Sequence, residues 1–155
     1  MLSIKLITEK SVALNSAIQL FKDYAVELNA DLCFQSFDAE LADPLKKYGT
    51  PKGALFLAYY NNEAVGCIAL QPLEDGSCEM KRLYVKPDFR KYKIGEALAQ
   101  QLLETAKSLS YKTMKLDTLE RLQAAINLYK KLGFTITTAY YQNPLPEVVY
   151  MEKAL

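Results

Sequence analysis

The stretch SCEMKRLYVKPDFRKYKIGEALAQQLLETAKSL, residues 77–109, passes from the pattern of a strand to that of a helix. Residues 78–85 are typical of a strand, whereas apolar residues over 94–106 recur on one helical face. A further strand is predicted for residues 112–118. Strand, helix, strand in this order requires parallel neighbours joined by a right-handed crossover.

Before this unit, the sequence predicts antiparallel strands. Strands at 54–60 and 64–73 flank a short turn with two asparagines, and strand 78–85 follows a second turn. The other predicted elements are strand 3–8, helix 11–28, a short helix over 39–47 capped by Asp38, helix 119–132 ended by Gly133, and strands 134–140 and 147–154. We therefore expect one α/β domain over residues 1–155, with a mixed sheet flanked by helices.

Composition excludes several classes of function. The 155 residues carry a net charge of +1, which argues against nucleic acid as a partner, and no stretch approaches a membrane span. The chain has no histidine, which removes Ser-His and Cys-His nucleophile pairs and the usual metal sites. Its three cysteines are widely spaced, as expected of reduced thiols. We expect a cytoplasmic protein without a metal.

Basic residues gather where the strand at 78–85 gives way to the helix. Arg90, Lys91 and Lys93 precede Gly95 at the expected helix start, where backbone N–H groups bind phosphate well. Two interpretations fit the residues alone: a pyrophosphate site, or solvated basic side chains at a helix start. The P-loop and dinucleotide glycine patterns are absent from the sequence.

The segment EMKRLYVKPDFRKYKIGEAL, residues 79–98, resembles the cofactor motif of the GNAT superfamily of N-acetyltransferases, Arg/Gln-x-x-Gly-x-Gly/Ala. AINLYKKLGF, residues 125–134, is similar to the family's second motif, a helix with Tyr followed by Gly-Phe. The tail YYQNPLPEVVYMEKAL, residues 140–155, resembles a bacterial subgroup with Tyr-Tyr-x-Asn-Pro near its end. The resemblance implies the acyl-CoA N-acyltransferase fold.

The same resemblance implies acetyl-CoA as the acetyl donor. The family's strand binds the pantetheine arm through backbone groups, and its loop amides hold the pyrophosphate. The matching residues here are Leu83, Tyr84 and Val85 on the strand, and Arg90, Lys91, Tyr92, Lys93, Ile94, Gly95 and Glu96 in the loop. Lys93 stands where the family usually has its first glycine. A negative φ accommodates this lysine and a positive φ strains it; we expect the loop to tolerate it.

Two residues are candidates for the chemistry. Strand alternation places Glu79 on the same face as Lys81, Leu83 and Val85, and its position eleven residues before Arg90 resembles that of the glutamate base in some members of the family. The alternatives for Glu79 are pairing with Lys81 and binding of a cationic substrate. Tyr129 matches the family's tyrosine, which can protonate the departing thiolate; its alternative is core packing.

Four further residues are candidates for acceptor binding: Asp117, Thr118, Gln142 and Asn143. Helix capping by Asp117 or Thr118 and turn formation by Asn143 are the alternatives. Cys78 is expected to face the core, away from Glu79, which argues against a covalent acetyl-cysteine.

The leading functional prediction is direct transfer of acetyl from acetyl-CoA to a primary amine, carried by a small molecule or a peptide. The alternative is a non-catalytic acyl-CoA-binding sensor on the same fold, suggested by Lys93. A monomer and a homodimer are both compatible with the sequence.

Overall fold

The computed structural model describes the backbone of residues 1–155 and the side chains other than that of Phe34. Its strands are β1 (Leu2–Leu6), β2 (Ala54–Tyr60), β3 (Glu63–Pro72), β4 (Cys78–Val85), β5 (Thr113–Leu119), β6 (Thr135–Thr137) and β7 (Val148–Ala154). Its helices are α1 (Val12–Leu28), α2 (Phe37–Ala42), α3 (Pro44–Tyr48), α4 (Ile94–Ser108) and α5 (Gln123–Lys131), with 3₁₀ turns η1 (Cys33–Gln35) and η2 (Pro87–Tyr92).

The strands form one mixed sheet in the order β1-β2-β3-β4-β5-β7-β6. The hairpin β2–β3, whose turn residues Asn61 and Asn62 both have positive φ, and the third antiparallel strand β4 are confirmed. β4 and β5 pair in parallel across α4, as the strand–helix–strand pattern predicts. The predicted α/β class with a mixed sheet is therefore confirmed.

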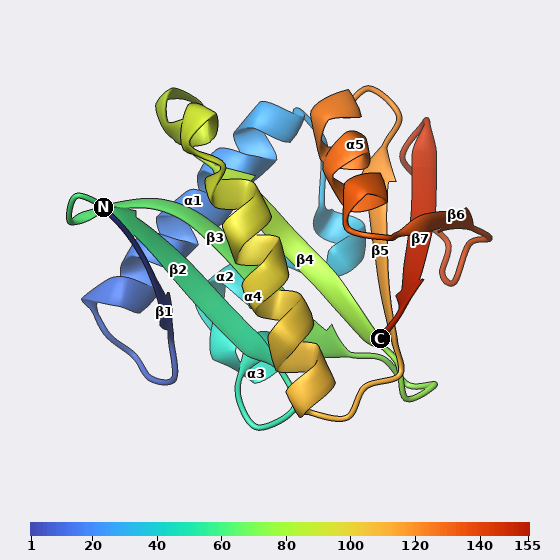
Figure 1. Cartoon of the computed structure of the whole chain (residues 1–155), viewed down its shortest axis with the longest axis horizontal. Helices are drawn as coiled ribbons and strands as arrows, with labels where there is room; N and C mark the ends of the chain where they lie inside the picture. The colour runs from blue at the N-terminus through green and yellow to red at the C-terminus, as the bar shows by residue number, and fades with distance from the viewer.

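Helices cover both faces of the sheet (Figure 1). α4 packs the side chains of Ile94, Leu98 and Leu102 into one core with the sheet, and α5 joins this layer through Tyr129. α1 covers the opposite face, where Phe21 packs edge-on against Tyr48 of α3 at 6.1 Å between ring centroids. Within the described residues, none of the helices combines the length and apolar character needed to cross a bilayer.

The parallel ladder between β4 and β5 is short. It consists of the pairs Cys78↔Met114 and Glu79↔Lys115, although both strands continue for several residues. Beyond Glu79, the two strands separate, and the edge of β4 that faces β5 carries backbone groups without a strand partner. This gap opens toward the carboxyl ends of the parallel strands, where α/β folds bind ligands.

A β-bulge in β4 changes which side chains share a face. Arg82 has a φ of 60°, and the register with β3 shifts by one residue there. Glu79 and Lys81 share the face toward α1 as predicted, but Leu83 and Val85 turn to the α4 side. The prediction that all four share one face is wrong, because the extra residue inverts the alternation.

Several element boundaries also differ from the prediction. Asp38 does not cap a helix over 39–47; it lies in the first turn of α2, and Pro44 begins the separate helix α3. Leu119 ends β5, so the last helix begins at Gln123, and the strand expected at 134–140 is confined to β6.

Candidate active site

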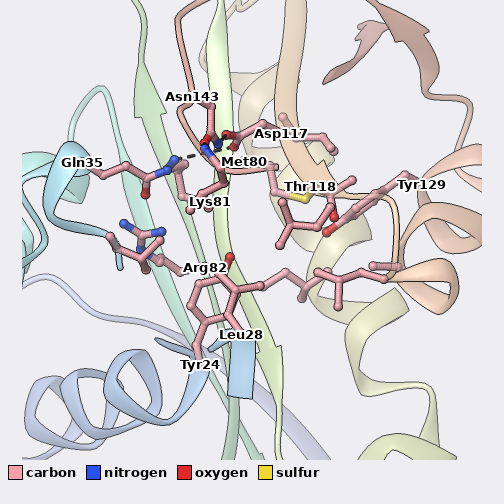
Figure 2. A pocket seen from close by; sticks show the side chains of 17 residues that line it. Tyr24, Leu28, Gln35, Met80, Lys81, Arg82, Asp117, Thr118, Tyr129 and Asn143 are labelled. Carbon is pink, nitrogen blue, oxygen red and sulfur yellow. Dashed lines mark hydrogen bonds and ion pairs between the residues drawn. The ribbon is translucent and has the colours of Figure 1, made fainter. Parts of the chain in front are cut away.

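Three hollows surround the gap between β4 and β5. The central pocket, about 80 Å³, lies between residues 80–83 and 116–119 of the separating strands (Figure 2). The outer groove, about 520 Å³, lies among the end of β4, the start of α4, α5 and the end of α1. The polar cavity, about 600 Å³, is lined by side chains of β3, β4, α3 and the segment between β6 and β7.

Neighbouring hollows have lining residues in common, and these shared residues show which hollows adjoin. The central pocket and the outer groove share Tyr24, Leu83 and Tyr129, among others. The central pocket and the polar cavity share Gln35 and Lys81. The central pocket therefore joins a groove on one side to a polar cavity on the other.

The start of α4 forms one wall of the outer groove. The first backbone bond of the helix runs from the Ala97 N–H to the Lys93 carbonyl at 3.2 Å, so the amides of residues 94–96 precede it and remain available to an anion. Lys93 has φ 58° and ψ 32°, the left-handed conformation that glycine favours. Of the two alternatives for Lys93, the strained one applies.

The space beside Gly95 is open. Outside its own helical turn, the nearest atom to a Cβ built on Gly95 would be the Cγ2 of Val85, at 3.8 Å. Glu96 pairs with Lys131 of α5 at 2.8 Å, and this hydrogen bond lowers the pKa of the carboxyl. The groove thus has room over the amides.

Arg90 connects the loop to β4 and α1. Its Nε donates to the Val85 carbonyl at 2.9 Å, and its Nη2 pairs with Glu27 of α1 at 2.6 Å. Its side chain still lines the groove. Lys91 and Tyr92 do not line the groove: Tyr92 stacks on Tyr60 at 4.3 Å between centroids, and the Lys91 ammonium lies 5.4 Å from the centroid of the Tyr92 ring.

Apart from Lys91 and Tyr92, the expected coenzyme residues thus fall into two groups. The groove is lined by Leu83, Tyr84, Val85, Arg90, Lys93, Gly95 and Glu96. The Ile94 side chain is buried in the core, which leaves its backbone amide as the group able to face a ligand.

Tyr129 stands at the boundary between the groove and the central pocket. Figure 2 shows its ring reaching from α5 toward β5, beside Thr118. Its side chain is buried, and its ring packs edge-on against that of Phe134 at 5.9 Å between ring centroids. Burial, helped by Tyr24 and Asp117, raises the pKa of the Tyr129 hydroxyl, so it stays protonated at neutral pH.

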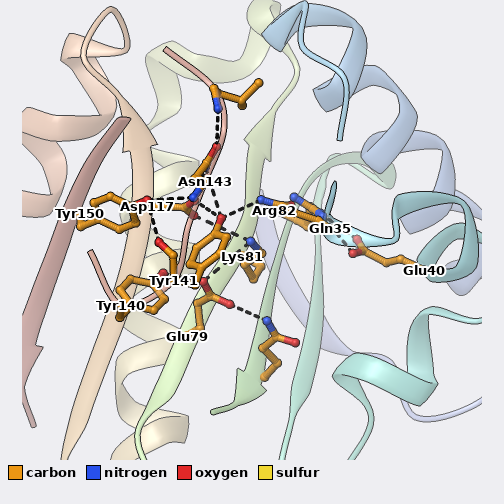
Figure 3. Close-up of polar contacts among 12 residues, drawn as sticks. Gln35, Glu40, Glu79, Lys81, Arg82, Asp117, Tyr140, Tyr141, Asn143 and Tyr150 are labelled. Atoms are coloured by element: carbon orange, nitrogen blue, oxygen red, sulfur yellow. Dashed lines mark hydrogen bonds and ion pairs between the residues drawn. The ribbon is translucent and has the colours of Figure 1, made fainter. Parts of the chain in front are cut away.

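Glu79 lies in the polar cavity within a dense hydrogen-bond network (Figure 3). Its Oε1 accepts from Gln71 and its Oε2 from the Tyr140 hydroxyl, both at 2.5 Å, and the Lys81 ammonium lies 3.8 Å from Oε2. Each carboxylate oxygen keeps a second lone pair. Glu79 can therefore still accept a proton or bind a cation.

Asp117 and Asn143 meet on the wall of the central pocket. The Asn143 Nδ2 donates to Asp117 at 2.7 Å, and the Tyr141 hydroxyl donates to the same carboxylate. Asn143 also accepts from the Leu145 N–H at 2.9 Å, so the turn before Pro144 is formed as well. Thr118 lines the pocket, whereas Gln142 is exposed and lines none of the three hollows as described.

Cys78 packs in the core on the opposite face from Glu79, as predicted. Burial, together with the Glu79 charge, raises the pKa of its thiol to about 12, so the thiol is a poor nucleophile.

Comparison with known proteins supports the family that the sequence motifs resemble. Residues 15–134 match the model of the acetyltransferase (GNAT) family. A relative from Schizosaccharomyces pombe, an uncharacterized N-acetyltransferase, is 46% identical over 134 residues, which cover 85% of this chain and 82% of the relative. The chain belongs to the acetyltransferase (GNAT) family. As a member, it is an N-acetyltransferase that uses acetyl-CoA.

Solved structures share this GNAT fold. An acetyltransferase from Streptococcus agalactiae is 22% identical with a TM-score of 0.83, covering 99% of this chain and 98% of that one. A Bacillus subtilis acetyltransferase in complex with CoA is 22% identical with a TM-score of 0.69, covering 100% and 99%.

Further residues that the sequence analysis did not assign to the site also lie there. Arg82 makes a two-pronged ion pair with Glu40 of α2, through Nε at 2.7 Å and Nη2 at 2.9 Å, with both side chains buried. Lys81 lies between Glu79 and Asp117, and burial lowers the pKa of its ammonium. The left-handed backbone conformation of Arg82 orients the Lys81 and Arg82 side chains toward the site. The local sequence gives no signal for this conformation, because residue 82 is not a glycine.

The tyrosines of the tail are the other residues missed. The Tyr140 hydroxyl donates a hydrogen bond to Glu79, and the Tyr141 hydroxyl donates one to Asp117. Burial, together with the charges of these carboxylates, raises the pKa of both hydroxyls. The sequence did offer a signal, since the pair stands in the Tyr-Tyr-x-Asn-Pro stretch of the tail.

Proposed function

We propose that this acetyltransferase passes the acetyl group directly from acetyl-CoA to a primary amine, with Glu79 as general base and Tyr129 as general acid. The observation that carries the proposal is the position of Tyr129. Its hydroxyl stands at the wall shared by the outer groove and the central pocket, where a thioester entering from the groove meets an amine entering from the polar cavity.

Acetyl-CoA would lie in the outer groove. The amides of residues 94–96 would receive the pyrophosphate, with Arg90, Lys91 and Tyr92 fixing the loop and the Lys93 ammonium adding charge. Leu83, Tyr84 and Val85 would present the free edge of β4 to the pantetheine arm. The open space beside Gly95 is consistent with this placement.

The acceptor arrives as an ammonium and must lose a proton before it attacks. Glu79 would take that proton, directly or through a water molecule, because its oxygens keep free lone pairs. Asp117, Thr118 and Asn143 would position the acceptor in the central pocket. Gln142 stays in the proposal only as a contact at the outer surface.

The amine nitrogen then forms the new C–N bond as the thioester C–S bond breaks. The departing thiolate takes a proton from the Tyr129 hydroxyl, and the second N–H proton, which the attacking nitrogen loses as it becomes the amide, returns to the tyrosinate through water. Burial raises the pKa of Tyr129, so the hydroxyl keeps its proton until the thiolate forms, and the same dry surroundings make the thiolate a stronger base, which offsets the weaker acidity of the tyrosine.

The decisive test is Tyr129→Phe. We expect kcat to fall about a hundredfold, the lower range for loss of a general acid, while the Kd for acetyl-CoA measured by calorimetry changes less than threefold. Tyr111→Phe is the matched control, because the Tyr111 hydroxyl bonds to the Lys52 carbonyl away from the three hollows. Equal turnover in Tyr129→Phe and wild type would assign Tyr129 to the core alone.

We also propose that residues 1–155 act as one domain, as a monomer or homodimer in the cytoplasm. Its partners would be acetyl-CoA and an amine of a small molecule or peptide, without a metal, nucleic acid or membrane. The near-neutral net charge of +1 supports the part of this proposal that concerns nucleic acid.

A further inference from the structure

The buried charges beside the polar cavity form two clusters of opposite net charge. The acidic cluster consists of Glu79, Lys81 and Asp117, with the Lys81 ammonium 3.8 Å from an oxygen of each carboxylate. All three side chains are nearly inaccessible to solvent. Two carboxylates around one ammonium leave this cluster with one excess negative charge.

The basic cluster consists of Glu40, Lys47 and Arg82. The Glu40 carboxylate accepts from Arg82 at 2.7 and 2.9 Å and from Lys47 at 3.2 Å. Burial opposes ionisation of Glu40, but the bonds and charge of Arg82 outweigh it and hold its pKa below the usual range. One carboxylate between two cations leaves this cluster with one excess positive charge.

Each cluster reaches the polar cavity through part of its members, the acidic cluster through Glu79 and Lys81 and the basic cluster through Lys47. Figure 3 shows Glu79 and Asp117 on one side of Lys81, and Arg82 with Glu40 on the other. Glu79, Lys81 and Lys47 all line the polar cavity. The other charged pair in its wall, Lys115 with Asp75 at 2.8 Å, is neutral as a pair. Exposed Glu74 also borders the cavity.

A buried acceptor marks the end of the cavity nearest the central pocket. The Oε1 of Gln35 is buried and has no hydrogen-bond partner among the described residues, although the Gln35 Nε2 donates to Tyr141 at 3.1 Å. Gln35 lines both the polar cavity and the central pocket. An unpaired buried acceptor is costly, and an N–H donor from a ligand would satisfy it.

We propose that the acceptor amine is part of an amino-carboxylate, a zwitterion whose ammonium lies at the acidic cluster and whose carboxylate lies at Lys47. The ammonium would donate to Gln35 and Glu79, at the end of the cavity next to the central pocket, which Tyr129 also lines. The carboxylate would pair with Lys47, the member of the basic cluster that lines the cavity. This inference rests on the proposed function, since it names the acceptor class of the same site.

The test compares acids with matched amides. The twenty common L-amino acids are assayed singly for CoA release from acetyl-CoA, and the best acceptor is compared with its own carboxamide. We expect kcat/KM to be about tenfold higher for the acid, the effect of one charge-assisted contact that is partly exposed to solvent. Because the amide has more neutral amine at a given pH, intrinsic reactivity works against this result.

Lys47→Gln supplies the second arm, with Lys46→Gln as its control because Lys46 is an exposed neighbour outside the cavity. We expect Lys47→Gln to bring the acid-to-amide ratio close to one, and both Lys47→Arg and Lys46→Gln to keep it. Glu40 retains Arg82 in these variants, so the fold is expected to persist.

The outcomes separate this inference from the proposed function. Acetylation of amines with equal rates for acid and amide, or a ratio that Lys47→Gln leaves intact, would overturn the amino-carboxylate inference alone. Calorimetric binding of the acid to the CoA-saturated protein that depends on Lys47, with no acetylation, would support the inference and refute the proposed chemistry. Preference for peptides blocked at the carboxyl end would also overturn it.

Discussion

Lys93 offers the most direct test of how this loop works, because its backbone and its charge can be changed separately. Its φ of 58° places a side chain where the chirality of L-residues disfavours one, at a cost of about 1–2 kcal/mol. Glycine removes that cost but adds about 0.5–1 kcal/mol of unfolded-chain entropy. We therefore predict that Lys93→Gly raises the free energy of unfolding by about 0.5–1 kcal/mol.

Urea unfolding with an unchanged m-value measures this gain, which corresponds to a rise in Tm of about 1–4 °C for a chain of this size. Lys91→Gly is the matched control, since Lys91 lies in η2 without a positive φ and is expected to lose about 0.5–1 kcal/mol. If both glycine variants lose stability alike, the left-handed conformation of Lys93 carries no strain and the argument is refuted.

Lys93→Ala completes the design, because alanine keeps the Cβ and removes the rest of the side chain with its charge. We expect Lys93→Ala to match wild type in stability within about 0.5 kcal/mol. If the ammonium contacts the coenzyme phosphates, Lys93→Ala and Lys93→Gly weaken acetyl-CoA binding equally, and added salt narrows the difference from wild type. Unequal weakening would show that the backbone conformation at residue 93 also controls binding.

Two further predictions concern the buried carboxylates. Glu79→Gln is expected to lower kcat at least a hundredfold, because the acceptor ammonium then lacks a protein base to take its proton. A rise in KM alone would leave Glu79 as a binding residue, and an unchanged kcat would end the base role. Glu40→Gln leaves the buried Arg82 without its counter-charge and should cost about 3 kcal/mol in urea unfolding. Because the folded-state pKa of Glu40 is depressed, its stabilisation is present above the unfolded value of about 4.3 and disappears as pH falls through the lower folded value. The free energy of unfolding of Glu40→Gln should therefore fall less between neutral and acidic pH than that of wild type. If the two proteins lose the same free energy of unfolding as pH falls, the depressed pKa of Glu40 is not the source of the acid sensitivity.

Much of the architecture could be predicted because its signals are local. The strand at 54–60 matches β2 residue for residue, and the helix expected at 11–28 is α1, capped by the Ser11 hydroxyl on the Leu14 N–H at 3.2 Å. The placement of the basic loop between β4 and α4 is also confirmed. The Tyr-Tyr-x-Asn-Pro subgroup of the tail stays a prediction.

The sequence by itself determined the order of elements, the parallel crossover and the family, because periodicity and short motifs depend on neighbouring residues. Only the tertiary structure decided the polar site. Glu40, Glu79, Asp117 and Tyr140 come from four separate segments, and they meet because buried charges must find partners wherever the fold brings them together. The bulge at Arg82 is decided in the same way: the ion pair with Glu40 accompanies a conformation that the local sequence disfavours.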